Sequence, residues 1–178
     1  MNQKEARAYA EQLNQDPGWR EVLDKCPCTK TEAEQSPKFE QSQLFVETYH
    51  PGAESAFRST EATTYQHSVL GKMQVGQQCT YDKSGHLITQ GLGAGTPDSV
   101  SPEYGTYSHY TKDVLTHKAL GHQEYNQTWT PNQGDNCGTR FQNLNELKNA
   151  TINPSEQSLN PSSPNVNSTQ SHSPSPNF

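Results

Sequence analysis

Four cysteines constrain this chain more than any other feature: Cys26 and Cys28 flank Pro27, whereas Cys79 and Cys137 stand alone. Only 29% of the 178 residues are hydrophobic, against roughly 45–50% in an average soluble domain. The chain therefore cannot build a large core, and a small core needs covalent cross-links or metal to be stable. An even number of cysteines fits two disulfides, in any of three connectivities.

The compartment in which those bonds would form is left open by the sequence. Residues 1–15 contain no apolar segment of the kind that marks an ordinary signal peptide. Cytosolic thiols stay reduced, so the chain is either exported by a route without such a signal or cytoplasmic with free thiols. No apolar stretch approaches the roughly 20 residues of a transmembrane helix.

Charge excludes one class of partner. The formal charge is −6, and no run of Lys and Arg occurs. A nucleic-acid surface normally carries a basic stripe, so we expect no nucleic-acid partner.

Hydrophobic periodicity predicts short elements around a small core. We expect helices over 3–14 and 107–120, a third near 32–36 where Thr31 and Glu34 resemble a capping box, and a fourth around 141–147. Strands are expected over 43–49, 63–70, 73–81 and 86–90. Trp19, Val22 and Leu23 are the expected core anchors.

These elements predict an α+β fold, with a small irregular antiparallel β core, short flanking helices and disulfide support. We expect an N-terminal helix over 1–17, a domain over 18–125 and a C-terminal extension with Cys137 over 126–148. Residues 149–178 are rich in Pro, Ser and Asn. Such a composition cannot offset its own ordering entropy, which predicts a disordered tail.

Catalytic and metal patterns are weak. The loop 91–95 is rich in glycine but lacks the Lys of a P-loop. A Ser–His–Asp set could combine Ser101 or Ser108 with His109 and either Asp98 or Asp113, although the Gly-x-Ser-x-Gly pattern is absent. His109, Asp113 and Asp98 are therefore only weak catalytic candidates. The cysteine and histidine spacings do not fit structural zinc, so no metal and no cofactor is expected.

One ordered set of motifs goes beyond composition. The motifs are Gly18-Trp19, Cys26-Pro27-Cys28-Thr29, Tyr49-His50-Pro51-Gly52-Ala53 with Phe57-Arg58-Ser59, Gly76-Gln77-Gln78-Cys79 with Tyr81-Asp82, Gly95-Thr96-Pro97-Asp98, and His109-Tyr110 with Asp113-Val114-Leu115. This order resembles the AMOP domain, an adhesion-associated domain of membrane mucins, isthmin and related extracellular proteins, over residues 18–116.

The resemblance implies a disulfide-rich extracellular module without enzymatic activity. Further cysteines of the family are missing here, because Ala56 and Thr80 occupy two such positions and none follows the segment 113–115. The resemblance implies that Cys26 or Cys28 bonds Cys79 and that Cys137 takes the other.

Aromatic and charged residues of these motifs are the candidates for contact with a partner. We expect the contact residues to be Tyr49, His50, Arg58, Tyr104, Tyr107 and Trp129, because Tyr and Trp are favoured at contact sites. Phe57 and Tyr110 are expected in the core instead. Arg58 is expected to brace the loops by pairing with Asp82, Asp98 or Asp113.

The function favoured by the sequence is a non-enzymatic binding or adhesion-type module for a protein or glycan partner, on a secreted or injected assembly. Two alternatives remain. One is a small secreted effector or hydrolase that uses the region of His109 and Asp113, and its marker would be a pocket that holds His109 beside a second polar group. The other is a structural component of a larger particle.

Overall fold

The computed structural model of the chain describes residues 1–42 and 46–152. Residues Met1–Gln142 form one compact unit, and a second unit begins at Asn143. The expected tail lies outside the described residues from 153 onward. Among the described helices, none is long and apolar enough to span a membrane.

The predicted α+β class is confirmed. The strands are β1 (Phe39–Ser42), β2 (Ser55–Ser59), β3 (Thr63–His67), β4 (Gly71–Tyr81) and β5 (Pro97–Asp98). The helical segments are α1 (Gln3–Asn14), α2 (Gly18–Glu21), α3 (Lys30–Gln35), α4 (Val46–Tyr49), α5 (Thr106–His109), the π-helical η1 (Tyr110–Val114), α6 (Leu115–Leu120), α7 (His122–Thr128) and α8 (Cys137–Ile152).

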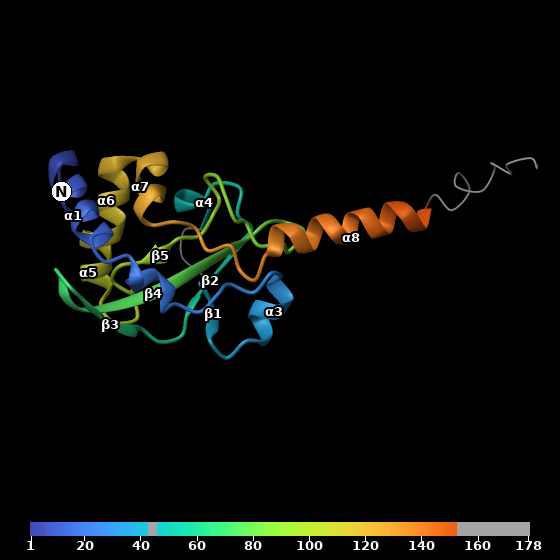
Figure 1. The fold of residues 1–178 in the computed structure, drawn as a ribbon, viewed down its shortest axis with the longest axis horizontal. Coiled ribbons are helices and arrows are strands. Elements are labelled where there is room, and N and C mark those ends of the chain that lie inside the picture. Colours follow the sequence, from blue (N-terminus) through green and yellow to red (C-terminus); the bar gives the residue numbers. More distant parts are fainter. Residues whose placement is uncertain (43–45, 153–178) are drawn as a thin grey trace, which may run out of the picture. The chain divides into compact units, whose positions relative to one another are not determined.

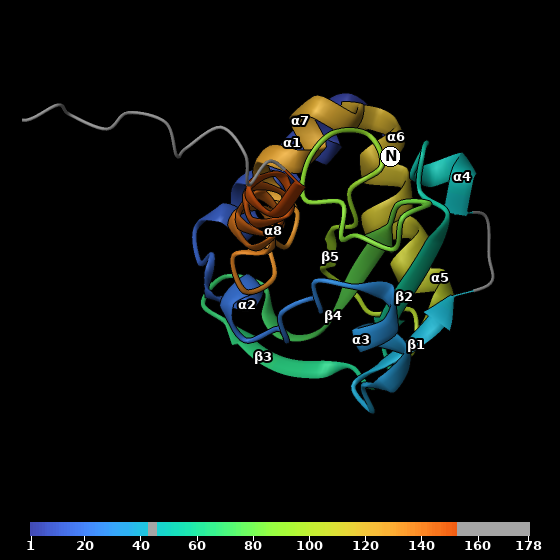
Figure 2. The same ribbon diagram turned by 90° about the vertical axis from the view of Figure 1, so that its right-hand side faces the viewer.

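The strands form an antiparallel sheet in the order β1-β2-β4-β3, and β5 pairs with β4 as well. β4 runs through the middle of the first unit (Figures 1 and 2). Its residues from Val75 to Tyr81 are all buried, without the alternation of a half-exposed strand. Both faces of this part of β4 are therefore covered.

Two apolar clusters make up the core. In the first, side chains of α1, α6 and α7, which lie side by side (Figures 1 and 2), form one buried cluster with the fully buried Trp19 and Trp129. Tyr125 stacks on Trp129, with ring centroids 4.3 Å apart. The second cluster gathers the four cysteines around Phe57 and Tyr81. The expected burial of Phe57 is confirmed.

The cysteine pairing fits the one that the resemblance implied. Cys26 bonds Cys79, and Cys28 bonds Cys137. The segment Cys26-Pro27-Cys28 is thereby bonded both to the central strand β4 and to the start of α8. These bonds close loops with sequence separations of 53 and 109 residues.

The helix expected near 32–36 differs in its start. α3 begins at Lys30, because its capping box is formed by Thr29 and Glu32 and not by Thr31 and Glu34. The Thr29 hydroxyl accepts a hydrogen bond from the amide of Glu32 at 3.2 Å, and the Glu32 carboxylate accepts one from the amide of Thr29 at 2.9 Å. Both pairs have the same spacing, so the sequence pattern alone did not separate them.

The expected strand over 43–49 is wrong for its second half, because Val46–Tyr49 is the helix α4; residues 43–45 lie outside the described residues. The expected hairpin arm over 86–90 is reduced to one bridge of Leu87 to Tyr81 and another of His86 to Thr29. Val22 is 45% exposed and not a core anchor. Leu23 follows Trp19 by one helical turn and shares its buried side, whereas Val22 points away.

The helix expected over 107–120 is present as α5, η1 and α6 in direct succession. The wider π turn over Tyr110–Val114 changes which side chains face inward. His109 and Asp113 are buried, whereas Tyr107 is 79% and Tyr110 42% exposed. The expectation that Tyr110 belongs to the core is therefore wrong.

Loss of the longer disulfide should destabilise the fold measurably. For the double variant Cys28→Ser/Cys137→Ser we expect the free energy of unfolding to fall by roughly 2–5 kcal/mol, because the unfolded chain regains the entropy of a long open loop. Urea unfolding followed by tryptophan fluorescence measures this change. The control is Ser84→Ala, in the exposed turn after β4, which should leave the midpoint unchanged. An unchanged midpoint for the double variant would contradict a structural role for this bond.

Candidate binding cleft

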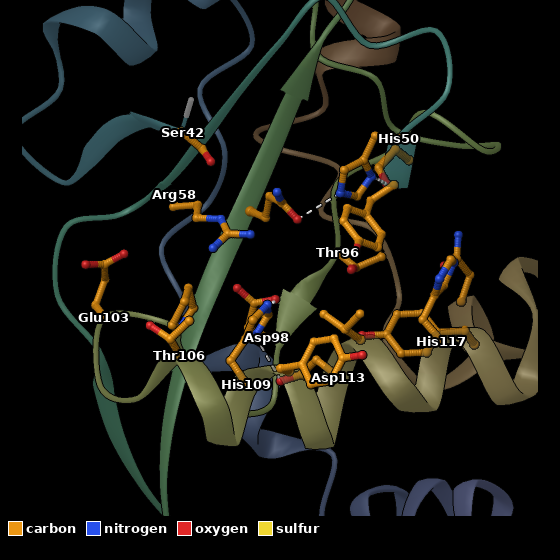
Figure 3. Close-up of a pocket in the computed structure, with 18 of the residues that line it drawn as sticks. Ser42, His50, Arg58, Thr96, Asp98, Glu103, Thr106, His109, Asp113 and His117 are labelled. Carbon is orange, nitrogen blue, oxygen red and sulfur yellow. Dashed lines mark hydrogen bonds and ion pairs between the residues drawn. The ribbon is translucent and has the colours of Figure 1, made fainter. Parts of the chain in front are cut away.

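A cleft of about 640 Å³ lies between the sheet and the helical segments α5 to α7. β2 contributes Arg58, β4 contributes Gln78 and β5 contributes Asp98, while the helices contribute His109 and Asp113. Figure 3 shows Arg58 and Asp98 facing His109 and Asp113 across the cleft. All lining residues belong to the first unit.

Asp113 anchors the floor of the cleft. Its Oδ1 accepts hydrogen bonds from the amide and hydroxyl of Ser99 at 2.9 and 2.7 Å and from Trp129 Nε1 at 2.8 Å. Its Oδ2 accepts one from the amide of Val100 at 3.0 Å. The side chain is 2% exposed. This carboxylate thus ties η1 to the loop after β5 and to the end of α7.

His109 lies between two carboxylates. Its Nδ1 is 3.0 Å from the carbonyl oxygen of Val100, 3.4 Å from Asp113 Oδ2 and 3.7 Å from Asp98 Oδ1. All three neighbours are acceptors, so Nδ1 carries a proton. Burial opposes the charged ring, but the negative charges of Asp98 and Asp113 outweigh it and raise the pKa of His109 to about 9. The imidazole is therefore a cation at neutral pH.

Asp98 is 4% exposed and turns its carboxylate into the cleft. Burial raises its pKa to about 6, while the charge of His109 acts against this rise. In the part of the chain that the structure describes, no hydrogen bond reaches this carboxylate. Asp98 Oδ1 forms an ion pair with His109, whose Nδ1 lies 3.7 Å away.

Arg58 does not form the expected brace. Within residues 1–42 and 46–152, it makes no ion pair with Asp82, Asp98 or Asp113, and its buried Nε has no hydrogen-bond partner. Asp82 is occupied by its own turn, where it accepts hydrogen bonds from the amides of Ser84 and His86. Asp113 is already saturated. The guanidinium points into the cleft (Figure 3). Its positive charge partly opposes the rise in the pKa of Asp98 that burial causes, without an ion pair between the two side chains.

At the other end of the cleft, His50 has both ring nitrogens in use. Nδ1 is 3.0 Å from the carbonyl oxygen of Ala94, and Nε2 is 2.9 Å from the Gln78 side chain. Burial lowers the pKa of His50 and favours the neutral ring. His50 therefore lines the cleft as a fixed wall between β4 and the loop before β5.

The structure separates the expected contact residues into groups. Tyr49, His50 and Arg58 line the cleft. Tyr104 and Tyr107 are 65% and 79% exposed and are not among its lining residues. The prediction that Trp129 contacts a partner is wrong, because its side chain is fully buried and its indole N–H donates a hydrogen bond to Asp113.

Several cleft residues were missed by the sequence analysis: Thr96, Glu103, Tyr110, His117 and Asn126. Thr96 belongs to one of the motifs that carry the AMOP resemblance, and Tyr110 to another, so those motifs were a usable signal for them. Asn126 has no comparable signal. Its Oδ1 is buried without a hydrogen-bond partner, and its Nδ2 lies 3.1 Å from His122 Nε2.

The pocket expected for a hydrolase is present, but its nucleophile is not aligned. The hydroxyl of Ser99 donates a hydrogen bond to Asp113, and the side chain of Ser101 is packed against Gly76. Among the described residues no Ser, Thr or Cys side chain hydrogen-bonds to His109. A ring that is already protonated cannot accept a proton from a hydroxyl.

The same three residues, Asp98, His109 and Asp113, lie close enough to share a cation, with ligand atoms within 4.8 Å of one another. The donor set does not fit that use well. Asp113 already accepts four hydrogen bonds, and His109 Nδ1 is engaged with Val100. Metal binding would require breaking those contacts.

Comparisons with known proteins point to one family. The model of the AMOP domain family matches residues 2–138, a longer span than the expected 18–116. The chain is 33% identical over 131 residues to human Sushi domain-containing protein 2, which covers 63% of this chain and 15% of that protein. The chain thus spans only a small part of this relative's length. No solved structure matches the chain significantly.

The buried His109 cation should make stability depend on pH. The unfolded ring loses its proton near pH 6.5, whereas the folded ring keeps it up to about pH 9. The folded state therefore holds more protons in this window, and the free energy of unfolding should fall as pH rises through it, by about 2 kcal/mol. Urea unfolding at pH 6, 7.5 and 9 measures the slope.

His109→Gln should flatten this slope, because Gln does not titrate. The control variant His86→Gln replaces an exposed histidine outside the cleft and should keep the slope of the parent chain. A slope that is unchanged in His109→Gln would show that His109 is not the responsible group.

Proposed function

Because the chain belongs to the AMOP domain family, an adhesion-associated group of extracellular modules, we propose that it is a non-enzymatic binding module that recognises its partner through the cleft. One observation carries this proposal. The cleft presents the buried Nε of Arg58, which has no hydrogen-bond partner in the described chain, together with the Asp98–His109 ion pair. Such groups in a concave site are typical of ligand recognition.

An extracellular setting is supported by the sulfur chemistry. All four cysteines are in disulfides. Disulfides persist in oxidising compartments and are rare in the cytosol. We therefore place the working form of the chain outside the cytosol, carried there on a secreted or injected assembly.

The alternatives fit the geometry less well. A hydrolase around His109 would need a hydroxyl or thiol within hydrogen-bonding reach and a neutral imidazole, and His109 is held as a cation by its neighbours. A particle component that orders only on assembly would lack a core of its own. Here Trp19 and Trp129 are fully buried within one chain, which favours a unit that folds alone.

Two tyrosines on the same helical stretch provide the test. Tyr110 lines the cleft, whereas Tyr107 is exposed and outside it. The oxidised chain of 178 residues, coupled to beads, is applied to arrays of extracellular-matrix proteins and of glycans. We expect binding that Tyr110→Ala weakens about tenfold, a change of ~1.4 kcal/mol. Tyr107→Ala should stay within about twofold, since it removes no cleft contact.

Thermal unfolding of both variants controls for folding. Absence of binding to every array member would contradict the binding function itself. Weakening by Tyr107→Ala but not by Tyr110→Ala would reject the cleft and move the contact face to the exposed tyrosines Tyr104 and Tyr107.

A further inference from the structure

The cleft contains unused hydrogen-bonding capacity. Among the described residues, four buried side-chain atoms have no partner, and two of them, Arg58 Nε and Asn126 Oδ1, belong to cleft residues. Asp98 adds a carboxylate that is 4% exposed and accepts no hydrogen bond from the described residues, although it forms an ion pair with His109 at 3.7 Å. Buried polar groups are normally paired, so these three point to a ligand that completes them.

The unpaired groups are of mixed character. Arg58 offers donors, and His109 adds a second cation whose Nε2 has no hydrogen bond among the described residues. Asp98 and Asn126 offer acceptors. A ligand that satisfies both kinds must donate and accept within a short distance.

The charged side chains of the cleft narrow the class of ligand further. An anionic ligand would meet the carboxylates of Asp98 and Asp113, with Glu103 on the wall beside them (Figure 3). A cationic ligand would meet Arg58 and the His109 cation. A neutral ligand avoids both repulsions, and a hydroxyl group is a donor and an acceptor at once.

The walls suit a ring with an apolar face. Tyr49, Tyr110 and Tyr125 line the cleft, and Tyr110 is 42% exposed. The volume of about 640 Å³ lies within the usual range of small-ligand sites. It is large enough for a mono- or disaccharide, whose C–H face can pack on a tyrosine ring.

We infer that the cleft binds a neutral saccharide, whose hydroxyls bridge Arg58 and Asp98 while the sugar ring rests on a tyrosine. This rests on the proposed function and adds the ligand class to it. Hydroxyls accept hydrogen bonds from the guanidinium and donate to the Asp98 carboxylate. A second hydroxyl donates a hydrogen bond to Asn126 Oδ1.

Sugars that differ only in charge test this directly. Saturation-transfer NMR on the oxidised chain of 178 residues compares the neutral, uronic acid and amino-sugar members of the gluco, galacto and manno series. We expect one neutral series to bind with millimolar affinity, and its acid and amine to bind at least about fivefold more weakly. Equal or tighter binding of a charged member would overturn the inference.

Variants locate the binding. Arg58→Gln and Asn126→Ala should each weaken the neutral sugar at least about fivefold, since each removes one hydrogen-bonding partner. Arg140→Gln is the matched control, because Arg140 pairs with Glu32 and lies outside the cleft. Thermal unfolding shows whether each variant folds. If one variant does not fold, the affinity of the other variant for the neutral sugar tests the site.

The outcomes separate this inference from the wider proposal. If no neutral sugar binds, but the arrays show a protein partner whose binding is weakened by Tyr110→Ala, the inferred saccharide ligand is wrong and the proposed binding function stands. If neutral sugars bind equally well to Arg58→Gln, Asn126→Ala and the parent chain, the cleft is not their site and the inference fails.

Discussion

The buried carboxylate of Asp113 is the interaction on which the cleft depends. It joins η1, the loop after β5 and the end of α7 through four hydrogen bonds, and it is out of reach of solvent. A buried charge is costly unless it is paired and fully hydrogen-bonded. Asp113 meets this condition, and the cation at His109 completes it. The helical side of the cleft is therefore fixed to the sheet side before any partner arrives.

The disulfides play the corresponding role for the rest of the first unit. With so few apolar residues, the second core cluster consists largely of cysteine sulfur with Phe57 and Tyr81. Cys79 lies in β4 opposite Phe57 of β2, so its bond to Cys26 fastens the N-terminal part of the chain directly to the central strand. Because cross-links replace part of the missing apolar area, the loops that line the cleft need not contribute to a core and are free to carry polar groups.

Local patterns predicted some parts of this structure well. The helix predicted over 3–14 agrees with the bounds of α1, and the predicted helix end at residue 120 agrees with the end of α6, where Gly121 follows with a positive φ of 75°. The motifs of the family resemblance contained Asp98, His109 and Asp113, and the sequence combined His109 with either carboxylate only as a weak catalytic candidate. Their meeting depends on the pairing of β5 with β4 and on the π turn of η1. Both are tertiary features without a local signature, as is the helical form of Val46–Tyr49.

The two residues judged least accurately show why contact sites resist prediction. Trp129 is an aromatic that looked suited to a surface, yet it is the centre of a core because Asp113 offers its indole a buried acceptor. Arg58 was expected to form a structural ion pair, yet Asp82 and Asp113 accept hydrogen bonds from other groups and Asp98 lies too far from the guanidinium for an ion pair. In each case the decisive fact is what the neighbouring polar groups already bind. Of the buried side-chain atoms without a hydrogen-bond partner among the described residues, Arg58 Nε and Asn126 Oδ1 belong to residues that line the cleft, and these atoms favour a role in recognition.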